Sequence, residues 1–187
     1  VSVALFAAGA SSLGDIWDGW GGDFSFLNGD FGDGSKQKPY QIKNKSQLMG
    51  LSQLAAMGMR VQAGEGGNEI IGSYDGKYFR LMNHIDLGGM DWNPIGFYRD
   101  SSELAGDVAG KFCGHFDGNG KTVSNFKLNN TSWNHVGFFG AVEDATIKNL
   151  TLKPGKTVYG GDQTGILAGS AKNSKITDCT VNGSVSA

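Results

Sequence analysis

Three short segments in the second half of the chain resemble one another, and this internal repeat most constrains the fold. Each segment joins a Gly-containing stretch to a second stretch in which apolar residues recur among polar ones: 112–116 with 123–128, 137–142 with 147–152, and 165–171 with 176–181. The positions that we align are Val123, Ile147 and Ile176. Units this short cannot bury their own apolar faces, so neighbouring units must stack to form one continuous core.

Short units, with two or three short strands in each, predict an all-β fold of the β-solenoid type. Propeller blades are the competing repeat, but their period is about 40 residues or more. We expect Asn125, Asn149 and Asp178 to recur at one corner of the stack, where they can hydrogen-bond backbone groups of a turn. The side chains expected to point into the core are Val123, Phe126, Leu128, Ile147, Leu150, Leu152, Ile176, Cys179 and Val181.

The composition fits a turn-rich protein and excludes several other classes. The chain has 31 Gly among 187 residues, a net charge of −2, and only 18% charged residues. This balance argues against a nucleic-acid partner, which requires a basic surface. No apolar run approaches the ~18–20 residues of a membrane-spanning helix. Cys113 and Cys179 fit small buried apolar residues better than a disulfide, although their pairing stays open.

The sequence divides what we expect to be a single domain into three parts. Residues 1–13 form an apolar strand or arm, 14–45 a Gly- and Asp-rich lead-in, and 46–187 a helix followed by the β-coils. The helix is predicted over 46–58, with Ser46 as its N-cap and Gly58 as its C-cap. We expect it to cap one end of the stack and to cover an open strand edge. Residues 1–10 can alternatively be read as the remnant of a secretory signal.

A series of motifs extends the repeat toward the N-terminus. They are Gly32-Asp-Gly-Ser35, Pro39-Tyr-Gln-Ile42, Gln47-Leu48, Tyr78-Phe-Arg-Leu81, His84-Ile-Asp-Leu87, Trp92-Asn-Pro-Ile-Gly96, Phe116-Asp-Gly-Asn-Gly-Lys-Thr122, Gly137-Phe-Phe-Gly140 and Gly165-Ile-Leu-Ala-Gly169. In this order they resemble the GLUG-repeat surface proteins of bacteria, over residues 32–183. The last motif has one extra residue between its glycines. The resemblance implies a right-handed parallel β-helix on a secreted or cell-surface, adhesin-like bacterial protein, and it implies no catalytic residues.

Residues that could support catalysis are present but do not form a recognised motif. The three histidines, His84, His115 and His135, lack metal-binding spacing. Cys113 and His115 lie two apart on a predicted strand and could act as nucleophile and base, but Cys113 occupies a repeat position that favours packing. Polysaccharide-active β-helices need carboxylates clustered on one face. Four candidates fall at turns of different coils, where solvation and turn formation explain them: Asp117, Glu143, Asp144 and Asp178.

Two kinds of ligand site are weaker hypotheses. Trp92, Tyr98 and Trp133 could stack on sugar rings, or they could pack within turns. Asn28, Asp30 and Asp33 alternate with glycines and could hold Ca²⁺ through oxygen ligands, with Asp15, Asp18 and Asp23 close by in the sequence. The bidentate Glu of a complete EF-hand loop is missing, so a structural turn is the competing interpretation. No other cofactor is predicted.

Self-assembly is predicted from the two ends of the chain. A spare apolar strand could add to the unpaired coil edge of another subunit and build a head-to-tail filament. The residues assigned to this contact are Val1, Val3, Leu5, Phe6, Val181 and Val185. The alternative is that the strand folds back on its own chain. The sequence thus predicts a non-catalytic surface or secreted protein for adhesion or assembly, with a host or cell-surface glycan or protein as a further partner. A carbohydrate-binding or carbohydrate-active β-helix module is the alternative.

Overall fold

A computed structural model describes residues 4–5, 21–27, 29–57, 61–62, 69–70, 74–96 and 110–187. Several predicted residues therefore lie outside the described part: Val1, Val3, Phe6, Asp15, Asp18, Asn28, Gly58 and Tyr98. The described part is mostly β-strand, with one α-helix and two short 3-10 helices. This agrees with the predicted all-β class and its single helix. The division into three parts stays a prediction.

The helical elements are η1 (Ser25–Leu27), η2 (Gly29–Phe31) and α2 (Lys45–Met57). The strands of the first half are β1 (Ala4–Leu5), β2 (Tyr40–Ile42), β3 (Val61–Gln62), β4 (Glu69–Ile70), β5 (Tyr78–Leu81) and β6 (Ile85–Asp86). Those of the second half are β7 (Lys111–Phe112), β8 (His115–Ser124), β9 (Asn129–Asn130), β10 (Phe139–Glu143), β11 (Thr146–Lys153), β12 (Val158–Gly160), β13 (Ala168–Lys172), β14 (Lys175–Thr177), β15 (Thr180–Val181) and β16 (Val185–Ser186).

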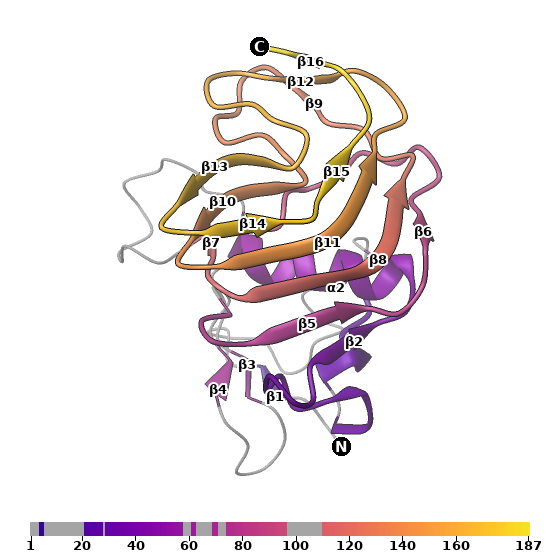
Figure 1. Ribbon diagram of the computed structural model, residues 1–187, viewed down its shortest axis with the longest axis vertical. Helices are drawn as coiled ribbons and strands as arrows, with labels where there is room; N and C mark the ends of the chain where they lie inside the picture. The colour runs from indigo at the N-terminus through magenta and orange to yellow at the C-terminus, as the bar shows by residue number, and fades with distance from the viewer. Residues whose placement is uncertain are drawn as a thin grey trace.

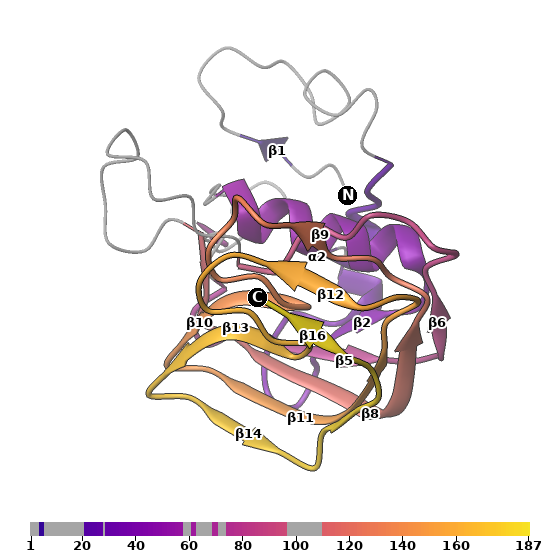
Figure 2. The same ribbon diagram turned by 90° about the horizontal axis from the view of Figure 1, so that it is seen from above.

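Three parallel sheets surround the core. The main sheet has the order β14-β11-β8-β5-β2, with β15 also paired to β11 and β6 to β8. The second sheet is β13-β10-β7 and the third is β16-β12-β9. From β7 onward the chain visits the second, main and third sheets in the same order three times, and the sheets form three sides of the molecule (Figures 1 and 2). A separate small sheet, β1-β3-β4, is antiparallel.

The strand register differs from the alignment that the sequence favours. Ile147 pairs with Phe116 on the preceding coil and with Ile176 on the following coil. The stretch of chain from Phe116 to Ile147 is therefore slightly longer than the stretch from Ile147 to Ile176. Val123 pairs with Leu152, and the predicted match of Val123 with Ile147 is wrong. The reason is a two-residue excess in β8, where the register shifts between Asp117 and Lys121. Asn119 and Gly120 there take left-handed backbone conformations with φ of 52° and 68°, which lets the extra residues turn outward.

Most of the predicted inward side chains are buried. Ile147, Leu150 and Leu152 are at most 1% exposed. Val123, Phe126 and Leu128 are at most 3% exposed. The third predicted set differs, because Ile176 and Val181 are exposed and Cys179 is only partly buried. Aromatic rings fill much of the interior in contact with one another, including Phe79, Phe112, Phe116, Phe138 and Phe139.

The three predicted corner residues occupy two different corners. Asn149 and Asp178 lie in register on neighbouring coils, between the pairs Lys148–Thr177 and Thr151–Thr180. Asn125 follows β8 at another corner, where its side-chain amide donates to both carboxylate oxygens of Asp86. All three have a positive φ of 55–56°, which Asn and Asp tolerate better than other non-glycine residues. The residue types were recognised correctly, but the prediction of one shared corner is wrong.

Helix α2 begins one residue earlier than predicted because its N-cap is Asn44. Asn44 Oδ1 accepts a hydrogen bond from the Gln47 N–H at 2.9 Å, and Gln47 Oε1 accepts one from the Lys43 N–H at 2.8 Å. These bonds provide acceptors for two amides at the start of the helix, as in a capping box. The prediction of Ser46 as N-cap is therefore wrong, although the motif Asn44-x-x-Gln47 is visible in the sequence.

Helix α2 packs against the sheets through its apolar face. Leu48, Leu51, Leu54 and Ala55 are at most 1% exposed. The helix lies on the side of the molecule that carries β9 and β12 (Figures 1 and 2). It is farther than these two strands from the C-terminus (Figure 1). The edge strand β2 is contacted by η1 of the lead-in, and the Phe26 ring packs edge to face on Tyr40. The edge strand at this end is thus contacted by the lead-in, whereas the prediction assigned this edge to the helix.

Candidate functional site

The last coil presents an open end. Within the described part of the chain, β13, β14, β15 and β16 each pair along one edge only. Three apolar side chains on these strands are exposed: Ile176 by 39%, Val181 by 48% and Val185 by 42%. Their partners in register one coil below are fully buried: Ile147, Leu152 and Val158. No strand of the described part of the chain pairs with these edges, whereas the same column is buried one coil earlier. We call these three side chains and the free edges of β13–β16 the open end.

The residues predicted for assembly divide between the open end and the small antiparallel sheet. Val181 and Val185 both belong to the open end. Leu5 lies in β1, which pairs antiparallel with β3 of the same chain through Ala4–Gln62 and Leu5–Val61. This pairing agrees with the alternative that the N-terminal strand folds back on its own chain. It argues against donation of that strand to another subunit.

Glu143 joins three neighbouring strands through ion pairs. Its carboxylate lies 2.6 Å from Lys111 Nζ on β7 and 2.5 Å from Lys172 Nζ on β13. The hydrogen bonds from Lys111 and Lys172 lower the pKa of Glu143 from its ordinary value of 4.5 to about 2. Since both lysines are committed to this carboxylate, the arrangement favours alignment of the second sheet over proton transfer.

We expect the variant Glu143→Gln to remove part of the pH dependence of stability. Because the folded-state pKa is depressed, ionised Glu143 stabilises the fold above pH 4.5, and this contribution is lost as the pH falls toward about 2. Wild type should therefore exceed the variant in its urea midpoint at pH 6, and the two midpoints should converge toward pH 2. A difference of equal size at both pH values would show that the ion pairs are not its cause.

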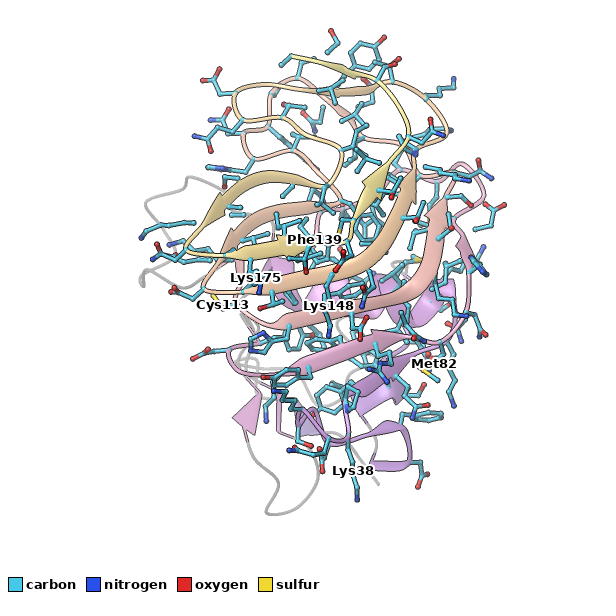
Figure 3. All side chains as sticks on the ribbon, viewed as in Figure 1. Lys38, Met82, Cys113, Phe139, Lys148 and Lys175 are labelled. Carbon is cyan, nitrogen blue, oxygen red and sulfur yellow. The ribbon has the colours of Figure 1, made fainter. Side chains whose placement is uncertain are left out.

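Asp117 ties together three strands of the main sheet. Its Oδ2 lies 3.1 Å from Arg80 Nη2 on β5 and 3.7 Å from Lys148 Nζ on β11. Its Oδ1 accepts hydrogen bonds from the Asn119 N–H and the Asn149 amide. Lys148 and Lys175 lie on the outward face of this sheet (Figure 3). No group of three or more His, Cys, Asp or Glu that could hold a metal ion occurs in the described part of the chain.

The structure does not present Cys113 and His115 as a reactive pair. Cys113 is only 8% exposed, and burial raises the pKa of its thiol to about 11, which keeps it protonated at neutral pH. The His115 ring stacks on Tyr78 with the centroids 4.2 Å apart, and burial lowers the pKa of His115. Both cysteines are free thiols. His84 accepts the backbone N–H of Thr122 through Nδ1, in a contact that joins neighbouring coils.

Trp92 belongs to the core and is closed to a sugar ring. It is 3% exposed, stacks on Phe138 at 4.8 Å with the planes 3° apart, and donates its indole N–H to the Phe138 carbonyl. The prediction of a sugar platform at Trp92 is therefore wrong. Trp133 is partly buried and packs against the core. Both tryptophans therefore pack within the protein, which was the alternative to sugar binding.

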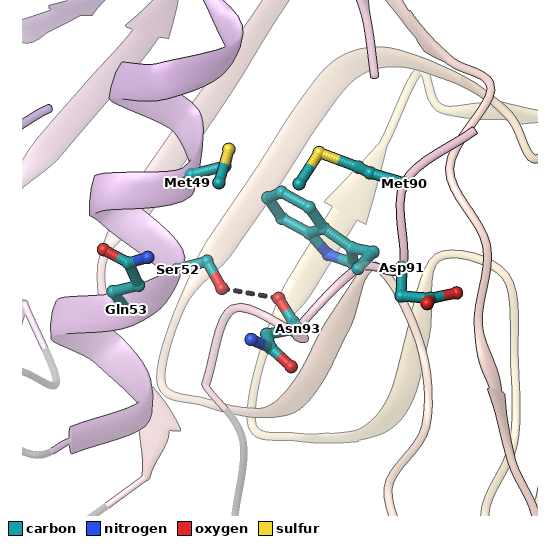
Figure 4. A pocket seen from close by; sticks show the side chains of 7 residues that line it. Met49, Ser52, Gln53, Met90, Asp91 and Asn93 are labelled. Atoms are coloured by element: carbon teal, nitrogen blue, oxygen red, sulfur yellow. Dashed lines mark hydrogen bonds between the residues drawn. The ribbon is translucent and has the colours of Figure 1, made fainter. Parts of the chain in front are cut away.

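A pocket of 240 Å³ lies between α2 and residues 90–93 (Figure 4). Its lining residues are Met49, Ser52, Gln53, Met90, Asp91, Trp92 and Asn93. Met90 extends toward α2 and Met49, and Ser52 Oγ donates to the Asn93 carbonyl across the gap. The volume is below the ~300 Å³ at which pockets for drug-sized ligands begin. Sequence reasoning missed this pocket because its two sides come from segments far apart in the sequence, which no local pattern links.

Residues of the predicted calcium site take part in turns of the lead-in. Asp33 Oδ1 accepts the N–H of Ser35 at 2.9 Å, and hydrogen bonds from Ser35 lower the pKa of Asp33. Asp23 accepts both the N–H and the hydroxyl of Ser25. Asp30 is exposed. These contacts are typical of structural turns, and Ca²⁺ binding stays a prediction.

Comparison with known proteins identifies two relatives that are much longer than this chain. A protein named as a Gly-rich membrane protein, from Evansella cellulosilytica, is 32% identical over 128 residues, which is 65% of this chain and 12% of the relative. Halomucin from Haloquadratum walsbyi is 27% identical over 159 residues, which is 82% of this chain and 2% of the relative. No protein-family model matches the chain, and no solved structure shows significant similarity to it. In the described part of the chain, no helix is long and apolar enough to cross a membrane. The chain is thus similar to small parts of two long proteins.

Proposed function

We propose that this chain is a non-catalytic, right-handed β-solenoid module of an exported or cell-surface protein of the GLUG-repeat kind, serving adhesion or assembly. The observation that carries the proposal is the stacking in register of three parallel sheets, each visited once per coil. In such a stack every coil buries the apolar face of its neighbour. The columns Phe116–Ile147 and Val123–Leu152, buried throughout, have this arrangement.

The names of the relatives support an extracellular or membrane-associated location. One relative is named as a Gly-rich membrane protein and the other as halomucin. This chain matches only 12% and 2% of their lengths, so the proposal concerns one module and leaves the activity of the longer proteins aside.

The described polar groups support a structural role over a catalytic one. Glu143 and Asp117 connect coils through ion pairs, and Cys113 has a raised thiol pKa. The carbohydrate-binding alternative loses Trp92, one of its three candidate aromatic residues, to the core. We therefore expect this module to act through contacts that its surface makes with other molecules.

Immunolabelling of intact cells of the source organism tests the proposed location. Antibodies raised against the folded chain should label cells that have not been permeabilised, and external protease should remove the signal. An antibody against a cytoplasmic protein serves as the control for cell integrity. Labelling that requires permeabilisation would overturn the proposal.

A further inference from the structure

Positive charge gathers on the main parallel sheet, although the chain as a whole carries a net charge of −2. In the described part of the chain, the strands of this sheet contain five basic and two acidic residues, and none of the seven is buried. They are Arg80, Lys121, Lys148, Lys153 and Lys175, against Asp86 and Asp117. The strands of the other two parallel sheets hold only Lys111, Lys172 and Glu143 as charged residues, all on the second sheet. The main sheet is therefore the face that attracts an acidic partner most strongly.

This face runs along the side of the stack and does not depend on where the chain begins or ends. Strands β5, β8 and β11 are each paired along both edges, so a further coil at either end would lengthen the face without covering it. Lys148 and Lys175 lie on its outward side (Figure 3). The side chains of Arg80 and Lys148 are each 46% exposed, although both contact Asp117, which is only 13% exposed. Two cations share one carboxylate, which leaves accessible positive charge in this row.

A row of threonines accompanies the cations on the same sheet. Thr122, Thr151 and Thr180 are in register on three successive coils, at the strand spacing of about 4.8 Å. Val123 and Leu152, the next residues along two of these strands, are buried, so Thr122 and Thr151 point outward. Hydroxyl groups both donate and accept hydrogen bonds, which is the chemistry that recognises the hydroxyls of a sugar.

We propose that the outward face of the main sheet binds an acidic polysaccharide, a linear sugar polymer that carries carboxylate groups. The inference rests on the proposed surface module and identifies the class of its partner. Carboxylates of the polymer pair with Arg80 and Lys148, and its hydroxyls bond to the threonine row. Arg80 and Lys148 stand two strand spacings apart, about 10 Å. Cations spaced this widely suit a polymer with few charges and many hydroxyls better than duplex DNA, which carries one charge per about 1.7 Å of its axis.

Binding to immobilised polygalacturonate, a linear polymer of carboxylate-bearing sugars, tests the inference. We expect the 187-residue chain to bind at micromolar concentration and to bind neutral dextran at least about tenfold more weakly. Salt screens exposed charges, so raising NaCl from about 50 mM to about 300 mM should weaken the binding. The absence of binding up to about 1 mM chain overturns the inference, as does equal affinity for dextran. Equal or tighter binding to duplex DNA at the same salt concentration overturns the assignment to a polysaccharide.

The double variant Arg80→Gln/Lys148→Gln locates the contact on the main sheet. We expect it to bind polygalacturonate at least about tenfold more weakly than wild type. The matched control is Lys111→Gln/Lys172→Gln, which also removes two cations that share one carboxylate, that of Glu143, but on the second sheet. This control should keep the wild-type affinity within about twofold. Equal losses in the two double variants overturn the assignment to the main sheet.

The variant Lys153→Glu keeps the test decisive if the first double variant fails to fold. Lys153 is exposed at the end of β11 and makes no ion pair within the described part of the chain. We expect at least about threefold weaker binding with an unchanged melting curve by circular dichroism. An unchanged affinity of this folded variant then overturns the inference. Surface labelling of cells does not depend on this face, so labelling retained without polysaccharide binding rejects this inference alone.

Discussion

Replacing Ile147 with Asp should leave the protein unfolded at room temperature. Ile147 is 0% exposed and lies between Phe116 and Ile176 in one column of the core. The change loses about 2–3 kcal/mol of apolar burial and adds the cost of a lone buried carboxylate, which is several kcal/mol. A domain of this kind has only about 5–15 kcal/mol of stability in total. We expect loss of the cooperative thermal transition, measured by circular dichroism.

The matched control is Ile176→Asp, the same substitution one coil higher in the same column. Ile176 is 39% exposed, so the new carboxylate keeps contact with water and should cost about 1 kcal/mol or less. A folded Ile147→Asp variant with an unchanged melting temperature would contradict the assignment of Ile147 to the core. Equal destabilisation by the two variants would contradict the difference between the buried column and the open end.

Replacing Trp92 with Ala should destabilise the protein by about 3–5 kcal/mol. The indole is 3% exposed and stacks on Phe138, and its N–H donates to the Phe138 carbonyl at 2.9 Å. The truncation leaves a cavity and also leaves a buried carbonyl without this donor. Urea unfolding followed by far-UV circular dichroism measures the loss, since the dichroism signal does not depend on the removed indole.

The variant Trp92→Phe separates packing from hydrogen bonding. It keeps an aromatic ring next to Phe138 but lacks the N–H, so we expect a smaller loss of about 1–2 kcal/mol. The sugar-platform hypothesis makes a different prediction, in which Trp92→Ala weakens binding to glycans and leaves the urea midpoint unchanged. An unchanged midpoint would therefore contradict the structure at this residue.

Prediction from sequence succeeded where a local pattern decides the outcome. The apolar spacing shared by the repeated segments placed Ile147, Leu150 and Leu152 on the inward face, and all three are buried. The structure also confirms the extra residue between the glycines of Gly165-Ile-Leu-Ala-Gly169. Val136 pairs with Thr164 and Phe139 pairs with Ala168, so the upper coil gains one residue between these two pairs.

The repeated glycines have a steric reason that only the packed coils reveal. A Cβ on Gly137 would lie 2.7 Å from the backbone nitrogen of Gly169 on the next coil. A Cβ on Gly169 would lie even closer to the carbonyl carbon of His135. The neighbouring coils approach so closely here that no side chain fits, which explains why glycine recurs at this place in the repeat.

The sequence by itself determined the mostly β-strand class, the existence of a repeating unit and most of the inward side chains that we predicted. These follow from the local spacing of apolar and polar residues, which depends only on near neighbours. The tertiary structure decided the register, because the two extra residues in β8 can be recognised only against the paired strand. It also decided that Ile176 is exposed while Ile147 is buried, since burial depends on whether another coil lies on top. Strand neighbours here are a whole coil apart in the sequence, so a local pattern identifies the residues that can be buried but not those that another coil covers.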